Sequence, residues 1–287
     1  MAFATYEHGG VRRVGELKGS SLVPLEGLVE LGAATTPQRL QDASRNYRGQ
    51  VQVEDVRLLP VVPRPSKVFC VGLNYRDHVT ESKRELPAYP VLFPKYASTL
   101  LGPHDDIVLP PESDQVDYEG EFAVVIGLPG RRIPEDRALR HVLGYTVAND
   151  ITMRDFQYRT HQWVQGKAWD ASTPVGPYLV HPADADIATA GIRTTLNGEK
   201  VQESDLSMLI FSVPRLIAEI SVFTALEPGD LILTGTPGGV GYHSDPQRFL
   251  RHGDQICVEV EGVGALRNMV RTETGRQTAA NDGAEAR

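Results

Sequence analysis

Residues 117–126 read DYEGEFAVVI, an acidic stretch that runs directly into an apolar strand pattern. Successive side chains of a strand point to opposite faces, so Asp117, Glu119 and Glu121 are predicted on one face, with neighbours roughly 7 Å apart along the backbone. Three like charges on one face repel, and they need solvent, a compensating cation or raised pKa values. The stretch therefore predicts a strand that carries either a cation site or an exposed acidic edge.

The segments around this strand are also rich in Val, Ile, Phe and Tyr and are bounded by Gly, Pro or Asp, which is typical of strands. Residues 207–225 instead have apolar residues near helical spacing and end before a Pro-Gly pair, which predicts a helix. The body of the chain is thus predicted to be mainly β with a few helices. The predicted strands are residues 67–72, 121–127, 143–148, 176–180, 192–196, 231–234 and 256–261.

The two ends of the chain differ from this body. Residues 1–65 contain short apolar segments and finish in a proline cluster, which indicates a small N-terminal module with a linker. Residues 272–287 are small, polar and alanine-rich, which is typical of a flexible tail.

Composition excludes several classes of protein. The chain of 287 residues has a net charge of −8 and lacks the basic surface that nucleic-acid binding requires. Two cysteines are too few for a disulfide framework. No apolar run approaches the ~20 residues of a membrane span, and residues 1–13 lack the apolar core of a signal peptide. A cytoplasmic protein with no membrane or nucleic-acid partner is expected.

A further acid follows the predicted strand at residues 143–148, which ends in Asn149 and Asp150. Carboxylates that converge from separate strands, with no His or Cys nearby in sequence, suit a hard cation such as Mg²⁺ or Mn²⁺ rather than zinc. The alternative is a solvated acidic edge strand without an ion.

A possible general base lies after the first predicted strand of the body. If that segment is helical, His78 and Glu81 share one face, and the carboxylate can orient the imidazole and raise its basicity. The alternative is an ordinary surface His beside a surface Glu.

Two more features could serve an anionic ligand. Lys167 would offset the charge of a carboxylate-rich site, although a lysine beside glycine is usually a solvated surface residue. Residues 233–241 read LTGTPGGVG, a glycine-rich loop that offers backbone N–H groups to an anion. The loop lacks both the GK[ST] and the GxGxxG patterns, so nucleotide binding has little support.

Taken in order, these segments resemble the fumarylacetoacetate hydrolase family, in the branch of acylpyruvate hydrolases and 2-hydroxyhepta-2,4-diene-1,7-dioate isomerases. The resemblance extends over residues 66–271 and is much more specific as an ordered set than in any one piece. The matching stretches are residues 71–75 with His78, 117–121, 149–150, 154–157, 166–167, 174–177, 196–198 and 234–237.

The resemblance implies a catalytic domain of mixed β-sandwich and β-roll type over residues 66–271, usually a homodimer, that holds one Mg²⁺ or Mn²⁺. It implies Glu119, Glu121 and Asp150 as the metal ligands. It also implies a base dyad, His78 and Glu81, on a mobile lid at residues 77–90. The remaining implied site residues are Lys167 beside the metal, Gln157 and Thr236 against the substrate, and Tyr75 and Arg76 as further contacts.

The activity expected from this resemblance is hydrolytic cleavage of a C–C bond in 2,4-dioxo acids, giving pyruvate and a carboxylate. The alternatives are decarboxylation of oxaloacetate or a related 2-oxo acid, and isomerisation or tautomerisation, because stabilising enolate charge serves all three reactions. Arg159 or His161 is expected to select an anionic distal group of the substrate. A non-catalytic metal- or acid-binding protein and a purely structural β-domain are the alternatives from other classes.

Overall fold

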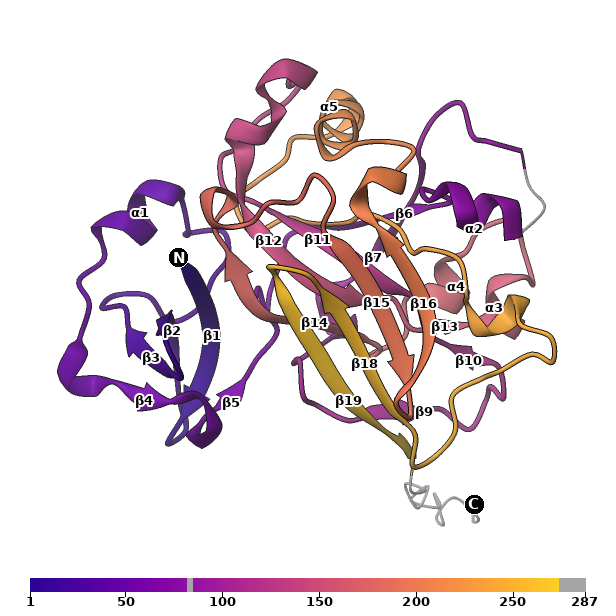
Figure 1. Ribbon diagram of the computed structural model, residues 1–287. Coiled ribbons are helices and arrows are strands. Elements are labelled where there is room, and N and C mark those ends of the chain that lie inside the picture. Colours follow the sequence, from indigo (N-terminus) through magenta and orange to yellow (C-terminus); the bar gives the residue numbers. More distant parts are fainter. Residues whose placement is uncertain (82–84, 274–287) are drawn as a thin grey trace, which may run out of the picture.

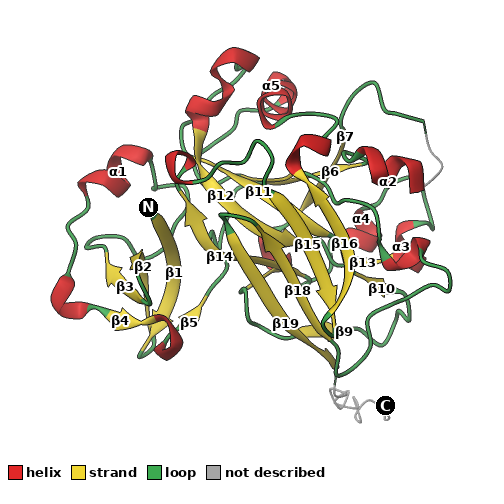
Figure 2. Cartoon of the chain, in the orientation of Figure 1, coloured by secondary structure: helices red, strands yellow, loops and turns green. Residues whose placement is uncertain are grey.

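The computed structural model describes residues 1–81 and 85–273. Within these ranges the chain is mainly β with a few short helices, which confirms the predicted fold class (Figure 1). Figure 2 shows strands in the centre of the molecule and most helices at its margins. Residues 82–84 of the predicted lid and the predicted tail beyond residue 273 lie outside the described residues, whereas Thr272 is the last residue of a strand.

The larger sheet has twelve strands within the described residues. Its main path runs β4-β3-β2-β1-β14-β12-β11-β17-β6-β7, with β5 paired to β1 and β8 paired to β14. The strands are β1 (Ala2–His8), β2 (Val11–Lys18), β3 (Ser21–Pro24), β4 (Val51–Gln52), β5 (Arg57–Leu58), β6 (Val68–Gly72), β7 (Val91–Lys95), β8 (Leu100–Leu101), β11 (Gly120–Ile126), β12 (Val142–Asn149), β14 (Thr173–Val180) and β17 (Leu231–Leu233).

A five-stranded sheet packs over β11, β12 and β14 of the larger one, in the order β16-β15-β18-β19-β9 (Figure 1). A two-stranded sheet, β10-β13, lies near the edge of the sandwich that also carries α3 and α4. These strands are β9 (Ile107–Leu109), β15 (Gly191–Leu196), β16 (Glu199–Asp205), β18 (Gln255–Val260), β19 (Gly264–Thr272), β10 (Val116–Asp117) and β13 (Thr152–Met153).

The helices in the described residues are short. The α-helices are α1 (Pro37–Asp42), α2 (Arg76–Glu81), α3 (Arg154–Gln157), α4 (Val164–Lys167) and α5 (Val213–Phe223). Turns of 3-10 helix occupy Tyr47–Gly49, Val53–Asp55, Ala97–Thr99, Glu135–His141, Pro182–Asp184, Leu206–Met208 and Gly241–His243. None of these helices is long and apolar enough to cross a membrane.

The predicted helix at residues 207–225 is shorter in the structure, because α5 begins only at Val213. Ser212 caps it by accepting a hydrogen bond from the Arg215 backbone N–H. The preceding backbone is held elsewhere, since the N–H groups of residues 210 and 211 donate to Asn74 at 2.8 and 2.7 Å. The apolar spacing therefore predicts the buried face of the helix correctly but not the residue at which the helix begins.

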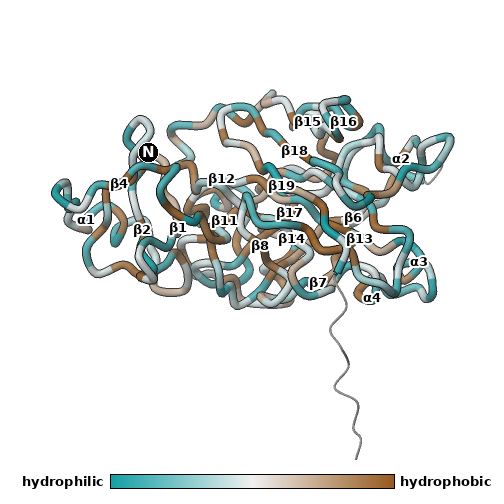
Figure 3. Tube along the Cα trace, turned by 90° about the horizontal axis from the view of Figure 1, so that it is seen from below, coloured by the Kyte–Doolittle hydropathy of each residue, from teal (hydrophilic) through white to brown (hydrophobic). Residues whose placement is uncertain are grey.

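β11 is buried along its whole length, and its side chains alternate between two apolar cores. Phe122, Val124 and Ile126 join the core beneath α5 and the second sheet, whereas Ala123 and Val125 join the core on the opposite face. A strand that is covered on both faces has a continuous apolar sequence rather than an alternating one. Figure 3 shows hydrophobic segments gathered in the middle of the molecule, around these strands.

The N-terminal residues 1–65 extend the larger sheet instead of forming a sheet of their own. β1 pairs with β14 through Ala2↔Val180 and Phe3↔Leu179. Phe3 also packs in the same core as Val125. The turn between β1 and β2 is Gly9-Gly10 with φ of +57° and +75°, a glycine pair that favours a tight hairpin. Hydrogen bonding and packing thus both continue from this region into the body.

Candidate functional site

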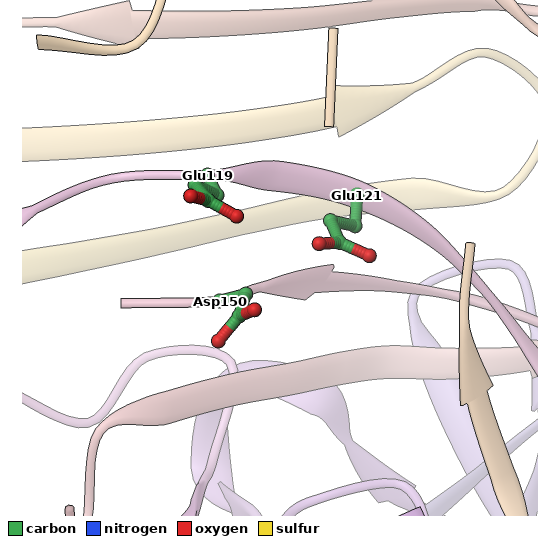
Figure 4. Close-up of side chains that lie close together, drawn as sticks. All are labelled: Glu119, Glu121 and Asp150. Carbon is green, nitrogen blue, oxygen red and sulfur yellow. The ribbon is translucent and has the colours of Figure 1, made fainter. Parts of the chain in front are cut away.

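Three buried carboxylates meet where β11 begins and β12 ends (Figure 4). Gly120 pairs with Asn149, so the residues beside that pair, Glu119 and Asp150, are brought together across the two strands. Glu121 follows on β11. Each of the three offers an oxygen that lies within 4.8 Å of the others, and their side chains are almost fully buried. We refer to Glu119, Glu121 and Asp150 as the carboxylate triad.

The backbone around the triad is fixed by polar side chains. Asn149 accepts a hydrogen bond from the Glu119 N–H at 3.0 Å, and Gln202 accepts one from the Gly120 N–H at 3.0 Å. Gly120 has no space for a side chain, because an added Cβ would lie 2.3 Å from the Thr194 hydroxyl. Glycine at position 120 therefore allows the two acids on either side of it to be packed under the second sheet.

Three cations contact two members of the triad, Glu119 and Asp150. Lys167 donates to Glu119 at 2.7 Å and to Asp150 at 2.9 Å, while Arg154 pairs with Glu119 at 2.7 Å. Lys95, which is fully buried, donates to Asp150 at 2.5 Å. Burial acts to raise the pKa of Glu119, but Lys167 and Arg154 outweigh it and lower that pKa to about 2. Glu119 is thus held as a carboxylate.

Glu121 has a different environment. Among the described residues it receives one hydrogen bond, from the Gly235 N–H at 2.7 Å. Burial, together with the negative charges of Asp150 and Glu119, raises the pKa of Glu121 well above its usual value. Around Glu121, the negative charge of the three carboxylates is therefore not fully balanced by positive groups of the protein. A donor set of carboxylate oxygens with uncompensated charge fits a hard divalent cation such as Mg²⁺ or Mn²⁺.

Asp117 is not part of the triad, contrary to the expectation that alternation would place three acids on one face. β10 ends at Asp117 and β11 begins at Gly120, so the strand is interrupted between the acids. The Asp117 carboxylate accepts from Arg154 Nε at 2.8 Å and from the N–H groups of Gly241 and Tyr242 at 2.9 and 3.0 Å. Its observed contacts hold a loop and an arginine in place.

The glycine-rich loop after β17 offers backbone N–H groups to anionic groups, as predicted, but these groups are carboxylate side chains of the protein itself. The N–H of Gly235 donates to Glu121, that of Gly239 donates to Glu81 at 3.0 Å, and that of Gly241 donates to Asp117. One loop thereby positions a triad carboxylate, the partner of His78 and the anchor of Arg154.

His78 and Glu81 lie on α2 as an adjacent pair, with His78 Nδ1 3.4 Å from the Glu81 carboxylate. Burial acts to raise the pKa of Glu81, but hydrogen bonds from His78 and Gly239 outweigh it and lower that pKa. His78 is buried and not exposed on the surface. The pair therefore has the geometry of an oriented imidazole.

A cavity of about 230 Å³ is lined by His78 of this pair and by Glu119 of the triad, whereas Glu81, Glu121 and Asp150 do not line it. Of the predicted site residues, His78, Glu119, Gln157, Lys167 and Thr236 line it. Its other walls are Val71, Gly72, Leu73, Phe93, Arg154, Tyr158, Trp163, Tyr242 and His243.

Four predicted contacts are not brought to the cavity within the described residues. Tyr75 is fully buried in a hydrophobic core, and Arg76 is exposed on α2. The Arg159 guanidinium lies 3.5 Å from the centre of the Phe156 ring, and His161 is exposed. The cavity wall is built from other residues.

Lys95 and His243 are two residues at or beside the site that the sequence does not predict. Lys95 ends a strand-like run, VLFPK at residues 91–95, and a lysine within such a run signals a buried ion pair. His243 follows the glycine-rich loop without any periodic pattern. Its position depends on the 3-10 turn at Gly241–His243.

Replacement of Lys95 by Met is expected to lower the free energy of unfolding, measured with urea in the presence of EDTA, by about 3–5 kcal/mol. The reason is that removing one partner of a buried ion pair leaves Asp150 without that compensation. Lys200→Met, at the exposed pair with Glu203, is the control and should leave the melting temperature nearly unchanged. If Lys95→Met lowers the free energy of unfolding no more than Lys200→Met does, the buried ion pair does not stabilise the protein.

Comparison with known proteins extends these observations. Residues 67–271 match the family described as fumarylacetoacetate (FAA) hydrolase C-terminal. This range includes all three residues of the triad and both residues of the His78–Glu81 pair.

Individual proteins are similar over most of the chain. The mitochondrial human protein named oxaloacetate tautomerase FAHD2A is 40% identical over 276 residues, covering 94% of this chain and 87% of that protein. Oxaloacetate tautomerase YisK of Bacillus subtilis is 44% identical over 224 residues, covering 76% of this chain and 74% of that protein. The crystal structure of 5-carboxymethyl-2-hydroxymuconate delta-isomerase from Mycobacterium smegmatis has a TM-score of 0.81 and 34% identity, covering 95% of this chain and 100% of that chain.

Proposed function

Because this chain belongs to the fumarylacetoacetate hydrolase family, we propose that it is a divalent-metal enzyme that interconverts the keto and enol forms of a small 2-oxo acid. Oxaloacetate is the substrate to test first. The support is the 40–44% identity with proteins named oxaloacetate tautomerase and the structural similarity to an isomerase. These findings favour the tautomerase alternative over the hydrolase that the sequence reading ranked first.

The observation that carries the proposal is an oriented imidazole that lines the same small cavity as Glu119, one member of the clustered carboxylate triad. Tautomerisation moves a proton between the carbon next to the carbonyl and the carbonyl oxygen. It requires neither an attacking water nor a second substrate. Glu119, Glu121 and Asp150 would hold a divalent ion, which would supply Lewis-acid polarisation of the carbonyl of a bound 2-oxo acid.

The chain's own residues would handle the proton. Glu81 engages His78 Nδ1, which leaves Nε2 to accept the proton from the substrate carbon and to release it again. Gln157 accepts from Arg154 through Oε1 at 2.9 Å, so its amide nitrogen is left to donate to the substrate. Lys167, buried between Glu119 and Asp150, places a fixed positive charge beside the carboxylate of the substrate.

Hydrolysis of acylpyruvates is the second candidate, favoured by the same His78–Glu81 pair, which would also suit activation of a water. Decarboxylation of oxaloacetate would use the same site. Homodimerisation and a small-molecule 2-oxo acid as the ligand remain part of the proposal.

The test is an NMR assay of enol-oxaloacetate in the presence of Mg²⁺ or Mn²⁺, with and without EDTA. Metal-dependent decay of the enol without loss of carbon is the expected result, and EDTA should slow it to the uncatalysed rate. Acetylpyruvate and fumarylpyruvate are assayed alongside. Pyruvate with a matching carboxylate would identify a hydrolase, and pyruvate with CO₂ from oxaloacetate alone would identify a decarboxylase.

A further inference from the structure

One part of the cavity wall is not used by the proposed chemistry. Tyr158, Tyr242 and His243 form this wall, which we call the distal wall. The Tyr158 and Tyr242 rings lie 5.0 Å apart, and the Tyr242 and His243 rings lie 5.2 Å apart at a steep angle. The three side chains come from the end of α3 and from the 3-10 turn at Gly241–His243.

His243 presents its ring to the cavity next to His78, with 6.1 Å between the ring centres. Within the described residues, no group hydrogen-bonds the His243 ring. The charged groups that act most strongly on it are Glu81, His78, Arg154 and Asp117. Burial is the main cause that lowers the pKa of His243, so the ring is neutral near pH 7 and has one N–H to donate.

Arg154 supplies a second unused donor at the same cavity. Its Nε is bound to Asp117, and its Nη1 is bound to Gln157 and Glu119. Its Nη2 is buried and has no hydrogen-bond partner in the part of the chain that the structure describes, and the residue as a whole is only 3% exposed. A buried guanidinium nitrogen without a partner is costly unless a ligand completes it.

We propose that His243 is a specificity-determining residue that binds the distal carboxylate of a 2-oxodicarboxylic acid, with Arg154 Nη2 as the second donor. The inference rests on the proposed function, since the 2-oxo acid end of the ligand must lie at the triad. A guanidinium and an imidazole N–H are suited to a carboxylate, and charge-assisted hydrogen bonds are the strong ones. The sequence reading assigned this role to Arg159 or His161, neither of which lines the cavity.

Two probes separate the distal interaction from binding at the triad. Oxalate has the chelating end alone, whereas 3,3-difluorooxaloacetate adds a distal carboxylate and cannot form an enol. Both are titrated calorimetrically into the Mg²⁺-loaded protein. His243→Leu is expected to weaken binding of the difluoro acid at least about tenfold, which corresponds to the loss of one charged hydrogen bond. The affinity for oxalate should stay within about twofold of the wild-type value.

Controls and kinetics sharpen the result. His161→Leu removes an exposed histidine that does not line the cavity, and it should change the affinity for neither probe. His243→Gln keeps an N–H donor and should recover part of the lost affinity. With oxaloacetate, His243→Leu should raise KM while kcat changes little, because the lost contact is made in the ground state and the transition state alike.

The outcomes are distinguishable. Equal affinities of wild type and His243→Leu for the difluoro acid, or equal losses for both probes, would overturn the inference. Wild-type protein that binds oxalate but not the difluoro acid would also overturn it. If the expected discrimination is observed but enol-oxaloacetate is not converted, the proposed function fails and the role of His243 stands.

Discussion

The Glu121→Gln protein is expected to bind Mg²⁺ or Mn²⁺ at least about 100-fold more weakly than the wild type and to lose its metal-dependent turnover. Loss of an outer partner of a metal ligand alone typically costs 10–100-fold in affinity, and Glu121 offers an oxygen within the 4.8 Å cluster itself. Glutamine keeps the shape but supplies a neutral oxygen.

Stability without metal is expected to change in the opposite direction. Glu121 is buried against two other carboxylates, so neutralising it removes repulsion, and the Gly235 N–H can still donate to the glutamine oxygen. In EDTA the variant should therefore be as stable as the wild type or more stable. At 100 times the dissociation constant, Mg²⁺ should stabilise the wild type by about 2.7 kcal/mol and the variant much less. Thermal melting with and without Mg²⁺ measures both effects.

Glu119→Gln is the matched comparison. It should also lose the ion, but it removes the carboxylate that pairs with Lys167 and Arg154, so its stability in EDTA should fall. Metal-dependent stabilisation of Glu121→Gln equal to that of the wild type would show that the triad is not the ion site.

The His78→Asn protein is expected to lose turnover of oxaloacetate by about 10²–10⁴-fold, the usual contribution of a positioned acid or base, while its affinity for Mg²⁺ changes little. His78 lines the cavity but is not one of the clustered carboxylates. Turnover is measured by decay of the enol, and metal affinity is measured by calorimetry on the same protein.

Glu81→Gln tests the orientation of the imidazole. Glutamine can still accept from the Gly239 N–H but has no charge to stabilise a protonated His78, so a smaller loss of turnover is expected. His161→Asn is the control for His78→Asn, since that ring is exposed. Equal losses of turnover and of metal affinity in His78→Asn would indicate that His78 is structural.

The family resemblance implied the three triad residues, and two short-range rules by themselves also pointed to this acidic region. Glu119 and Glu121 flank one residue at the start of an apolar strand, and Asp150 follows the end of another. The same rule was wrong for Asp117, because alternation holds only while the strand continues. Helical periodicity was likewise wrong about residues 207–212. The backbone N–H groups of residues 210 and 211 donate to Asn74, a contact between distant parts of the chain that prevents an earlier start of the helix.

The partners of Lys95 and His243 could not be assigned from sequence for a related reason. Lys95 reaches Asp150 across 55 positions of the chain, and the role proposed for His243 depends on its ring lying beside that of His78. Such pairings are set by the folded sheet and its loops, and no local pattern encodes them. Tyr75, predicted from its place in a motif, is instead buried in a core.

The region that matches the family begins at residue 67, yet one hydrophobic core lies across that boundary. A gene without its first 65 codons would encode β14 with part of its edge open and Val125 and Leu233 facing water, a surface prone to self-association. Evolution can therefore vary the sequence of the N-terminal strands only while it keeps a strand that covers this edge. In a chimaera of two relatives, the catalytic region would have to be transferred together with its own N-terminal cover.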